Sequence, residues 1–339
     1  MAPKIRESAT QVDLLNVGKD GISASGSVAD KLLANNFNVN ALRANNSLMY
    51  DEWKDIDKVV LKATKSRLVG VQRLLGAGLT YNIPNGLGKT VMTWQDQNDV
   101  TDAEVSMDAL SKGRRDRPDY TQKYMPLPVI HKDFSFGIRE LEASRNGTEP
   151  LDMTVAELAG RKVAEIVEQI LFKGYDDFTY GGGTIYGLED YTYVNTGDLS
   201  AAWDASGTTG ANKVNDLITM KQALIDAGFY GPYGVFVPAA YETGLDEDYT
   251  SSYAKTQLER LKSIGNISSI DIVDKMTQSK VVMAQMTADV IRMILGLSVT
   301  VVEWDSEGGF RKNFKVITIM LPQPRSAQDN SCGIAVYSA

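Results

Sequence analysis

The longest unbroken helical pattern in the chain runs from Thr148 to Gly174. Its apolar residues recur at steps of three, four and one, and such steps place them in one broad stripe on a helix with 3.6 residues per turn. The stripe consists of Leu151, Val155, Leu158, Ala159, Val163, Ile166, Val167, Ile170 and Leu171, and charged residues, Glu168 among them, occupy the other face. We therefore predict one long spine helix, and we expect Ile166→Asp to place a charge in its buried stripe and to prevent folding.

The ends of this helix also carry signals. Thr148 or Asp152 can accept the first free backbone amides, and Pro150 suits a first turn. Gly174 can adopt the left-handed conformation that ends a helix. The predicted helix thus begins near residue 148 and ends at residue 174.

The segment before residue 48 has a different pattern, because it is rich in Asn, Ser, Ala and Gly and poor in large apolar residues. Alone it could not bury enough surface to offset its ordering entropy, so we predict an arm that lies on another surface. Between Leu48 and Leu75 the apolar spacing strengthens and predicts one or two helices, which end at Gly76 and Gly78.

Residues 79–126 contain strand signals but no continuous apolar face. A turn at Pro84–Gly88, a strand at Val91–Trp94 and the charged run KGRRDRPD at 112–119 follow one another. An unstructured connection of this length is uncommon inside a compact domain. We predict a projecting two-stranded hairpin, which should rest on a partner because an isolated hairpin is marginally stable in water.

Beyond the hairpin, short strands alternate with short helices. Strands are predicted at Pro126–Phe136, Gly234–Val237, Ser269–Val273 and Val281–Met286, and a closing hairpin at Val299–Trp304 and Phe310–Leu321. Helices are predicted at Ile138–Arg145, Val214–Ile225, Tyr253–Ile264 and Ala288–Leu295. This mixture indicates the α+β class.

Composition adds limits to this picture. A chain of 339 residues exceeds one usual core, so two domains, or one domain with large excursions, are expected. No apolar run approaches a membrane span, and the start of the chain has no apolar segment resembling a secretory signal, so a cytosolic protein is expected. One cysteine, Cys332, and one histidine, His131, exclude a disulfide framework and a multi-ligand Cys/His zinc site. The net charge of −8 argues against an electrostatic nucleic-acid binder, although a negative surface facing packed nucleic acid remains compatible with it.

Candidate chemical motifs do not form a site. The sequence GLGKT at Gly86–Thr90 lacks the glycine at position 83 that a phosphate-binding loop needs, and Ile83 stands there. The run GGGTIYG at Gly181–Gly187 lacks the flanking strand and helix of a dinucleotide fingerprint. Both patterns favour turns or loops over nucleotide binding.

Single ionisable groups are equally weak candidates. His131 has no nucleophile or orienting partner identified by motif, which favours a structural or interface histidine over a general base. The acidic groups Asp176–Asp177 and Asp246–Asp248 lack the ligand spacing of a calcium loop and favour solvated loops. The run at 112–119 interleaves acids with its cations, which favours an ion-pairing interface over phosphate contacts. No catalytic residue, cofactor or metal is predicted.

The order of the parts resembles the Hong Kong 97-type shell proteins, the fold of tailed-bacteriophage major capsid proteins and of encapsulins. The resemblance rests on a polar arm, a projecting hairpin, the strand entering through PLPVIHKDFSFGIREL, the spine helix ending LFKG, and the closing hairpin VVEWDSEGGFRKNFKVITIMLPQPR. It implies an N-terminal arm and helix at 1–62, an extended loop at 79–125, a peripheral domain at 63–78, 126–199 and 296–339, and an axial domain at 200–295.

The same resemblance implies contacts between copies. The extended loop would lie over a neighbouring subunit, with Lys89, Trp94, Arg114, Arg115 and Arg117 as intersubunit contacts. Some relatives crosslink a lysine of this loop to a neighbour's asparagine. Lys89 lies in that region, but the sequence identifies no asparagine partner for it.

Two functions follow from the resemblance. The first is a tailed-phage major capsid protein in pentamers and hexamers of an icosahedral shell around double-stranded DNA, found in the virion, with a portal and scaffold or decoration proteins as partners and no membrane. The alternative is an encapsulin shell that encloses a cargo enzyme. An enzyme with an acidic site is the third reading, which a monomeric, metal-bearing chain would favour.

Overall fold

The structure is a computed structural model, and it describes residues 50–97, 105, 107, 120–146, 151–250, 253–327 and 330–339. The predicted arm, Thr148, Pro150 and the charged run at 112–119 lie outside these residues. The chain forms two compact units. Unit 1 contains Met1–Ile56, Ser135–Asp152 and Glu303–Asn313, and unit 2 contains Asp57–Phe134, Met153–Val302 and Phe314–Ala339.

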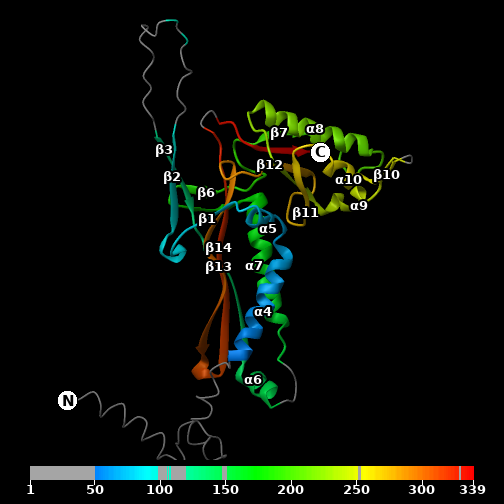
Figure 1. The fold of residues 1–339 in the computed structure, drawn as a ribbon. Coiled ribbons are helices and arrows are strands. Elements are labelled where there is room, and N and C mark those ends of the chain that lie inside the picture. The colour runs from blue at the N-terminus through cyan, green and yellow to red at the C-terminus, as the bar shows by residue number, and fades with distance from the viewer. Residues whose placement is uncertain are drawn as a thin grey trace, which may run out of the picture. The chain divides into compact units, whose positions relative to one another are not determined.

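The helices confirm most of the predicted helical segments (Figure 1). They are α4 (Tyr50–Arg67), α5 (Val69–Gly76), α6 (Ile138–Arg145), α7 (Thr154–Lys173), α8 (Gly210–Asp226), α9 (Glu242–Leu245) and α10 (Gln257–Lys262). Within the described residues, two helices, α4 and α5, precede Gly78, where the sequence predicts one or two, and Gly78 has a φ of +73°. Among the described residues, none of the helices combines the length and the apolar character that crossing a membrane would require.

Helix α7 is the predicted spine helix, but it begins later than expected. It starts at Thr154 after Met153, whose side chain makes no cap, and it ends at Gly174, where φ is +68°. The predicted start at residue 148 is therefore wrong, because apolar periodicity continued past the point where the backbone leaves the helix. The packed face is also narrower than predicted, since Val155, Leu158 and Ile166 are exposed on the subunit.

Small residues determine which face of α7 is buried. A Cβ at Gly160 would lie 2.9 Å from the carbonyl oxygen of Val60, so α4 approaches α7 closely at this point. Val163 and Val167 are buried near that contact line, whereas Ile166 remains 39% exposed. The premise that Ile166 is buried is therefore wrong, and Ile166→Asp is expected to leave the single subunit folded.

The strands form several small sheets and two larger ones. They are β1 (Thr80–Asn82), β2 (Val91–Gln97), β3 (Tyr120–Pro126), β4 (Ile130–Gly137), β5 (Tyr175–Tyr180), β6 (Gly183–Ile185), β7 (Asn195–Asp198), β8 (Tyr233–Pro238), β9 (Asp248–Thr250), β10 (Tyr253–Thr256), β11 (Ile267–Val273), β12 (Lys280–Gln285), β13 (Ile291–Ser306), β14 (Arg311–Pro324) and β15 (Ile334–Ser338). Short 3-10 turns occur at Gly86–Gly88, Ala239–Tyr241 and Glu307–Gly309.

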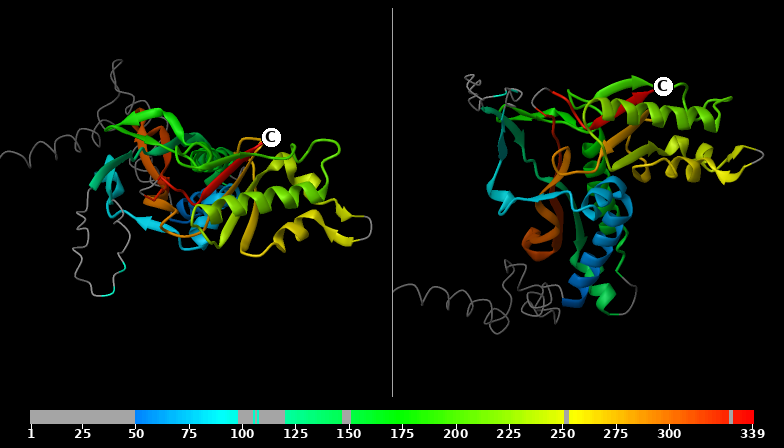
Figure 2. Two further views of the ribbon diagram at one scale, coloured as in Figure 1. Left: turned by 90° about the horizontal axis from the view of Figure 1, so that it is seen from above. Right: turned by 45° about the horizontal axis from the view of Figure 1, so that its top comes forward.

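The main sheet of unit 2 has five strands in the order β11-β8-β12-β15-β7. The pairs β11–β8 and β15–β7 are parallel, and β12 runs antiparallel to both of its neighbours. Helix α8 lies along this sheet (Figures 1 and 2). This mixture of parallel and antiparallel pairs with helices confirms the α+β class.

Both faces of this sheet are covered, which explains its apolar strands. Tyr233, Val235 and Val237 of β8 pack with residues of α8 in one core cluster. Phe236 points to the other face, where it contacts Phe172 of α7 edge to face at 5.2 Å. Because successive strand residues point to opposite faces, a strand covered on both sides reads as a continuous apolar run.

A second sheet has the order β1-β13-β14-β4. Its long hairpin β13–β14 confirms the predicted closing hairpin, but the helix predicted at Ala288–Leu295 is wrong. Ile291 is the first residue of the 16-residue strand β13, and Met293 of this strand pairs with Thr80 of β1. A short apolar run is compatible with a helix or with a strand, and here pairing with the neighbouring strands selects the strand.

The predicted helix at Tyr253–Ile264 is shorter than expected. Tyr253–Thr256 form β10, and α10 begins only at Gln257. The hydroxyl of Thr256 accepts the backbone N–H of Glu259 at 3.3 Å, which fixes the start of the helix. Thr followed three residues later by Glu is a known start signal, so the sequence contained this boundary.

Unit 1 has a small polar framework of its own. The side chain of Glu140 accepts the backbone N–H of Gly137 at 3.0 Å at the start of α6. At the tip of the β13–β14 hairpin, Lys312 is buried and its ammonium lies 2.7 Å from Asp305. The backbone N–H of Ile138 donates to the carbonyl of Phe310 at 2.9 Å, which joins the helix start to the hairpin.

Candidate subunit interface

The base of the predicted hairpin is a regular antiparallel pair. Strand β2 pairs with β3 from Val91↔Pro126 to Gln97↔Tyr120. This confirms a two-stranded hairpin for the part that the structure describes. Met92 and Met125 are buried with Ile170, Ile185 and other residues of unit 2. The expectation of little core therefore fails at the base, which is anchored in its own subunit.

The neighbouring β5–β6 hairpin is packed against β3. A Cβ at Gly183 would lie 2.4 Å from the carbonyl oxygen of Tyr124, so only glycine permits this approach of two backbones. A Cβ at Gly181, whose φ is +62°, would lie 2.6 Å from the side chain of Val91. These contacts hold β5 and β6 beside the hairpin base.

Large aromatic side chains are exposed around this junction. Every residue of β5 is exposed, although its sequence YDDFTY contains three aromatic rings. We call the exposed rings of this region the aromatic surface, which consists of Tyr120, Tyr124, Tyr175, Phe178, Tyr180 and Tyr186. Clustered exposed apolar residues mark binding surfaces more often than scattered ones do. The aromatic surface is therefore the strongest candidate for a contact with another copy.

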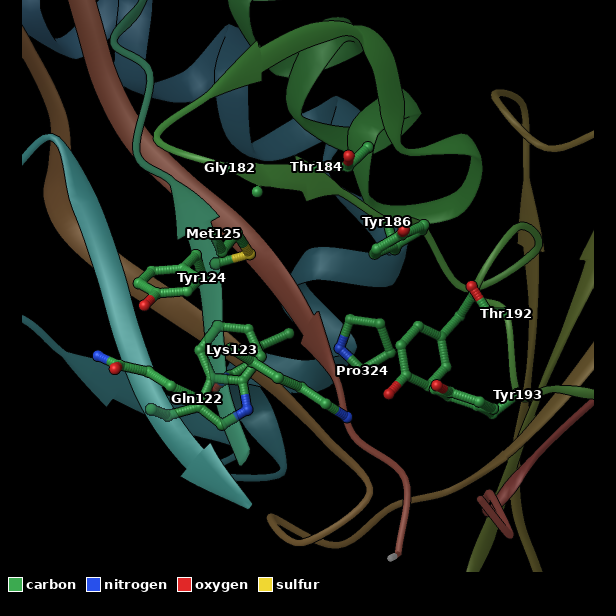
Figure 3. Close-up of a pocket in the computed structure, with 14 residues that line it drawn as sticks. Gln122, Lys123, Tyr124, Met125, Gly182, Thr184, Tyr186, Thr192, Tyr193 and Pro324 are labelled. Carbon is green, nitrogen blue, oxygen red and sulfur yellow. The ribbon is translucent and has the colours of Figure 1, made fainter. Parts of the chain in front are cut away.

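A cavity of about 290 Å³ lies beside the aromatic surface. Residues of β3, of the segment 182–193 and of the end of β14 surround it (Figure 3). Trp94 lines it from β2, and the Lys123 ammonium lies 5.5 Å from the centre of the Tyr193 ring. On another wall, the hydroxyl of Tyr191 donates to Ser326 at 3.0 Å. The cavity thus has aromatic walls with polar groups at their edges.

The predicted contact residues are only partly brought together. Lys89 is exposed directly after the turn Gly86–Gly88, whereas Trp94 is half-buried and lines the cavity. Arg114, Arg115 and Arg117 lie outside the described residues. His131 is exposed, with Nδ1 3.6 Å from a carboxylate oxygen of Asp133. The role of the predicted residues as intersubunit contacts stays a prediction.

Sequence reasoning missed the tyrosines that carry this site. Tyr124, Tyr186 and Tyr193 lie in segments that the sequence predicts as strand or irregular connection. A signal was present, because the interval 175–193 combines repeated tyrosines with glycines, and large rings in an irregular segment need a surface to pack on. The packing of β3 against this interval was not visible in the chain order.

A buried carboxylate is the clearest electrostatic feature of unit 2. Glu168 of α7 is 2% exposed and accepts the backbone N–H groups of Gly70 at 2.6 Å and of Val71 at 3.3 Å. Burial is the main cause that raises the pKa of Glu168 to about 7, against a partial opposite effect of the two amide bonds. The sequence placed this residue on the solvated face of its helix, and that placement is wrong because Glu168 caps α5.

Other ionisable groups offer little chemistry. Burial raises the pKa of the Cys332 thiol to about 11, so it is an inert core residue. Within the described ranges, no group of three or more His, Cys, Asp or Glu side chains is arranged to hold a metal ion.

Comparison with known proteins gives one family and several distant relatives. A family of unknown function, DUF6260, matches residues 40–320. The type 1 encapsulin shell protein EncA of Myxococcus xanthus (strain DK1622) is 24% identical over 226 residues, which are 67% of this chain and 72% of that protein. A diheme-cytochrome-encapsulin shell fusion protein of Kuenenia stuttgartiensis is 22% identical over 233 residues, 64% of this chain and 54% of that protein.

Solved structures show the same likeness. The virus-like particle from Pyrococcus furiosus aligns with a TM-score of 0.61 at 20% identity, over 84% of this chain and 98% of that one. The capsid of Myoviridae Phage XM1 aligns with a TM-score of 0.56 at 13% identity, over 78% and 90%. The chain therefore has a Hong Kong 97-type capsid fold and is encapsulin-like in sequence, which confirms the resemblance. The domain boundaries inferred from the resemblance stay predictions.

Proposed function

We propose that this chain, which belongs to the DUF6260 family of unknown function, is the building block of a closed icosahedral shell made of many identical copies. The observation that carries the proposal is the aromatic surface, whose rings are 37–54% exposed on the single subunit. An obligate interface between copies typically buries more than about 2,000 Å² and is rich in aromatic residues. In a shell, neighbouring copies would cover these rings.

The protein acts in this proposal as structure and not as a catalyst. Its named sequence relatives are shell proteins, and two ionisable groups of the subunit, Glu168 and Lys213, have structural partners. Glu168 caps α5, and Lys213 donates to the carbonyl of Gly244 at 2.9 Å. Any chemistry associated with the particle would then belong to its contents.

For the contents, the sequence relatives favour a nanocompartment that encloses a cargo enzyme. The two named curated relatives are encapsulin shell proteins, and EncA aligns over two thirds of this chain. The sequence alone placed the phage capsid protein first and the encapsulin shell second, and the relatives favour the opposite order. A phage major capsid protein remains the second candidate, because the fold is shared with the capsid of phage XM1. In that case a portal, scaffold or decoration proteins and packaged double-stranded DNA would be its partners.

The first experiment tests assembly. The full chain is produced alone, purified and measured by light scattering after size exclusion, and its particles are viewed by electron microscopy. We expect closed shells of uniform diameter. A chain that stays monomeric at high concentration and under mild crowding would contradict the shell proposal.

The second experiment tests the contents. Particles recovered from the source cells are treated with nuclease, and protected DNA and enclosed proteins are then quantified. An enclosed enzyme present at a fixed ratio to the shell supports the nanocompartment. Genome-length protected DNA and a portal protein would instead establish the capsid.

A further inference from the structure

Two arginines of unit 2 are brought near each other by the pairing of β13 with β14, since the backbone N–H of Arg325 donates to the carbonyl of Val290 at 2.8 Å. Arg292 is on β13, and Arg325 directly follows β14. Burial, and then the positive charge of Arg325, lower the pKa of Arg292. Within the described part of the chain, no ion pair joins either guanidinium to a carboxylate. Two guanidinium groups stay charged at any physiological pH, so their proximity is unfavourable unless an anion offsets it.

The orientation of Arg292 is fixed by two neutral neighbours. Its Nε donates to the side-chain oxygen of Gln323 at 2.6 Å. On one face its guanidinium carbon lies 4.5 Å from the centre of the Tyr81 ring. A guanidinium has five N–H donors in a planar fork, and the contact with Gln323 uses one of them. The plane of the fork is thus held in place while most of its donors remain for another acceptor.

Two buried donors beside this fork have no acceptor. The Nε of Arg325 and the Nε2 of Gln323 are both buried and make no hydrogen bond in the described structure. Gln323 as a residue is 1% exposed. Buried polar groups are nearly always hydrogen-bonded, and an unpaired donor requires an explanation. Unpaired N–H donors beside two positive guanidinium groups would be satisfied best by a negatively charged acceptor.

We propose that Arg292, Arg325 and the side-chain amide of Gln323 form a binding site for a small oxyanion, a phosphate or a carboxylate. A forked guanidinium matches the spacing of two oxygens on such a group and binds it with charge-assisted hydrogen bonds. The site is within reach of solvent, because Tyr81 is 43% exposed and both arginines are half-buried. The proposal does not depend on shell assembly.

The test compares the thermal stability of the full-length protein in phosphate, acetate and chloride at equal ionic strength. A ligand that binds only the folded state raises Tm in a saturable way. We expect phosphate or acetate to raise Tm at concentrations where chloride has no effect. Saturation by phosphate alone identifies a phosphate site, and saturation by acetate identifies a carboxylate site. An equal response to chloride would overturn the proposal.

Substitution of Arg292 should change Tm differently in the absence and in the presence of phosphate. Without phosphate, Arg292→Gln should raise Tm, because it removes the repulsion between the two charges. With phosphate, the same variant should need about tenfold more anion for the same shift, or show none. Arg292→Lys keeps the charge but loses the fork, and it should also bind more weakly. Arg292→Lys serves as the second variant if Arg292→Gln does not fold.

The matched control is Arg260→Gln on α10. Arg260 donates to Ser263 at 3.0 Å and lies 6.0 Å from the Tyr249 ring, so it resembles Arg292 in its contacts but belongs to a different part of the fold. Arg260→Gln should leave the rise in Tm with phosphate unchanged. The same phosphate response in Arg292→Gln as in the unmodified protein would overturn the site.

Discussion

Strands β5 and β8 have the same length and opposite environments. Each has six residues, and each contains tyrosine and phenylalanine, yet every residue of β8 is buried and every residue of β5 is exposed. Strand β8 has β11 and β12 on its two sides and helices over both faces, whereas β6 is the one strand that pairs with β5 among the described residues. An aromatic residue is thus buried only where the subunit supplies a cover.

The difference separates folding from assembly. The rings of β8 contribute to the stability of one subunit, because their surface leaves water when that subunit folds. The rings of β5 keep 37–53% of their surface in water, and only a second surface can cover that part. The proposed shell is that second surface, and substitutions in the two regions should therefore fail at different stages.

The largest expected effect separates the buried and exposed faces of α7. Val167→Asp places an unpaired charge in the core that backs the β8 sheet, and it should cost about 5 kcal/mol or more and prevent folding. Ile166→Asp, one residue earlier but 39% exposed, should cost less than about 1 kcal/mol. Urea unfolding of the unassembled subunits measures both. Equal loss in the two variants would mean that the buried face of α7 is misassigned.

The next effect compares one phenylalanine from each strand. Phe236→Ala on β8 should lower the free energy of unfolding by about 4 kcal/mol, because it leaves a cavity beside Phe172. Phe178→Ala on β5 should change it by less than about 0.5 kcal/mol. It should instead raise the protein concentration at which shells form by about tenfold, a size typical of an interface anchor. Light scattering against concentration distinguishes the two, and unchanged assembly of Phe178→Ala would remove β5 from the interface.

A smaller effect depends on pH and comes from Glu168. Burial raises its pKa from 4.5 to about 7 in the folded subunit, so the folded state holds this proton more tightly than the unfolded chain does. The free energy of unfolding should therefore decrease as pH rises from about 4.5 through about 7, by about 3 kcal/mol in total. Glu168→Gln cannot titrate and should remove this slope. If the free energy of unfolding of Glu168→Gln still decreases over this pH range, other groups cause the pH dependence.

The smallest effect on subunit stability is expected from shortening the hairpin. A deletion that begins at Lys89 would remove Met92, which is buried in the core, so it would confuse folding with assembly. Replacing residues 98–119 by a short glycine linker keeps the pairs from Val91↔Pro126 to Gln97↔Tyr120. The unfolding free energy should change by less than about 1 kcal/mol, because long loops affect stability only weakly. Shells of normal yield from this variant would show that the removed segment is not an intersubunit element.

Much of the order of elements could be predicted from the sequence. The two helices before Gly78, the strand and helix at 130–145, α8 and the closing hairpin follow from local periodicity and from glycine stops. The errors fall where a short apolar run fits two elements, as at Ile291, or where a cap residue was overlooked, as at Thr256. Local patterns report local preference, and neighbouring strands can override it.

The candidate site was less predictable. The resemblance points to Trp94 as an intersubunit contact and not as part of a cavity. Its cavity partners Tyr124 and Tyr193 come from segments that meet only after β3 packs beside the β5–β6 hairpin. The pair Arg292 and Arg325 is separated by a whole hairpin in sequence, and its proximity depends on the register of β13 and β14. Contacts between distant segments are set by packing, which no local pattern records.

The sequence by itself determined the class, the main helices and the presence of a two-stranded hairpin, because spacing and turn residues act over a few positions. Only the tertiary structure decided which of the apolar residues are buried. Glu168 is inside and Ile166 is outside on one helix, since α4 and α5 approach α7 from the side that glycine leaves open. Burial is a property of the surfaces that meet, and a residue's own hydrophobicity does not contain that information.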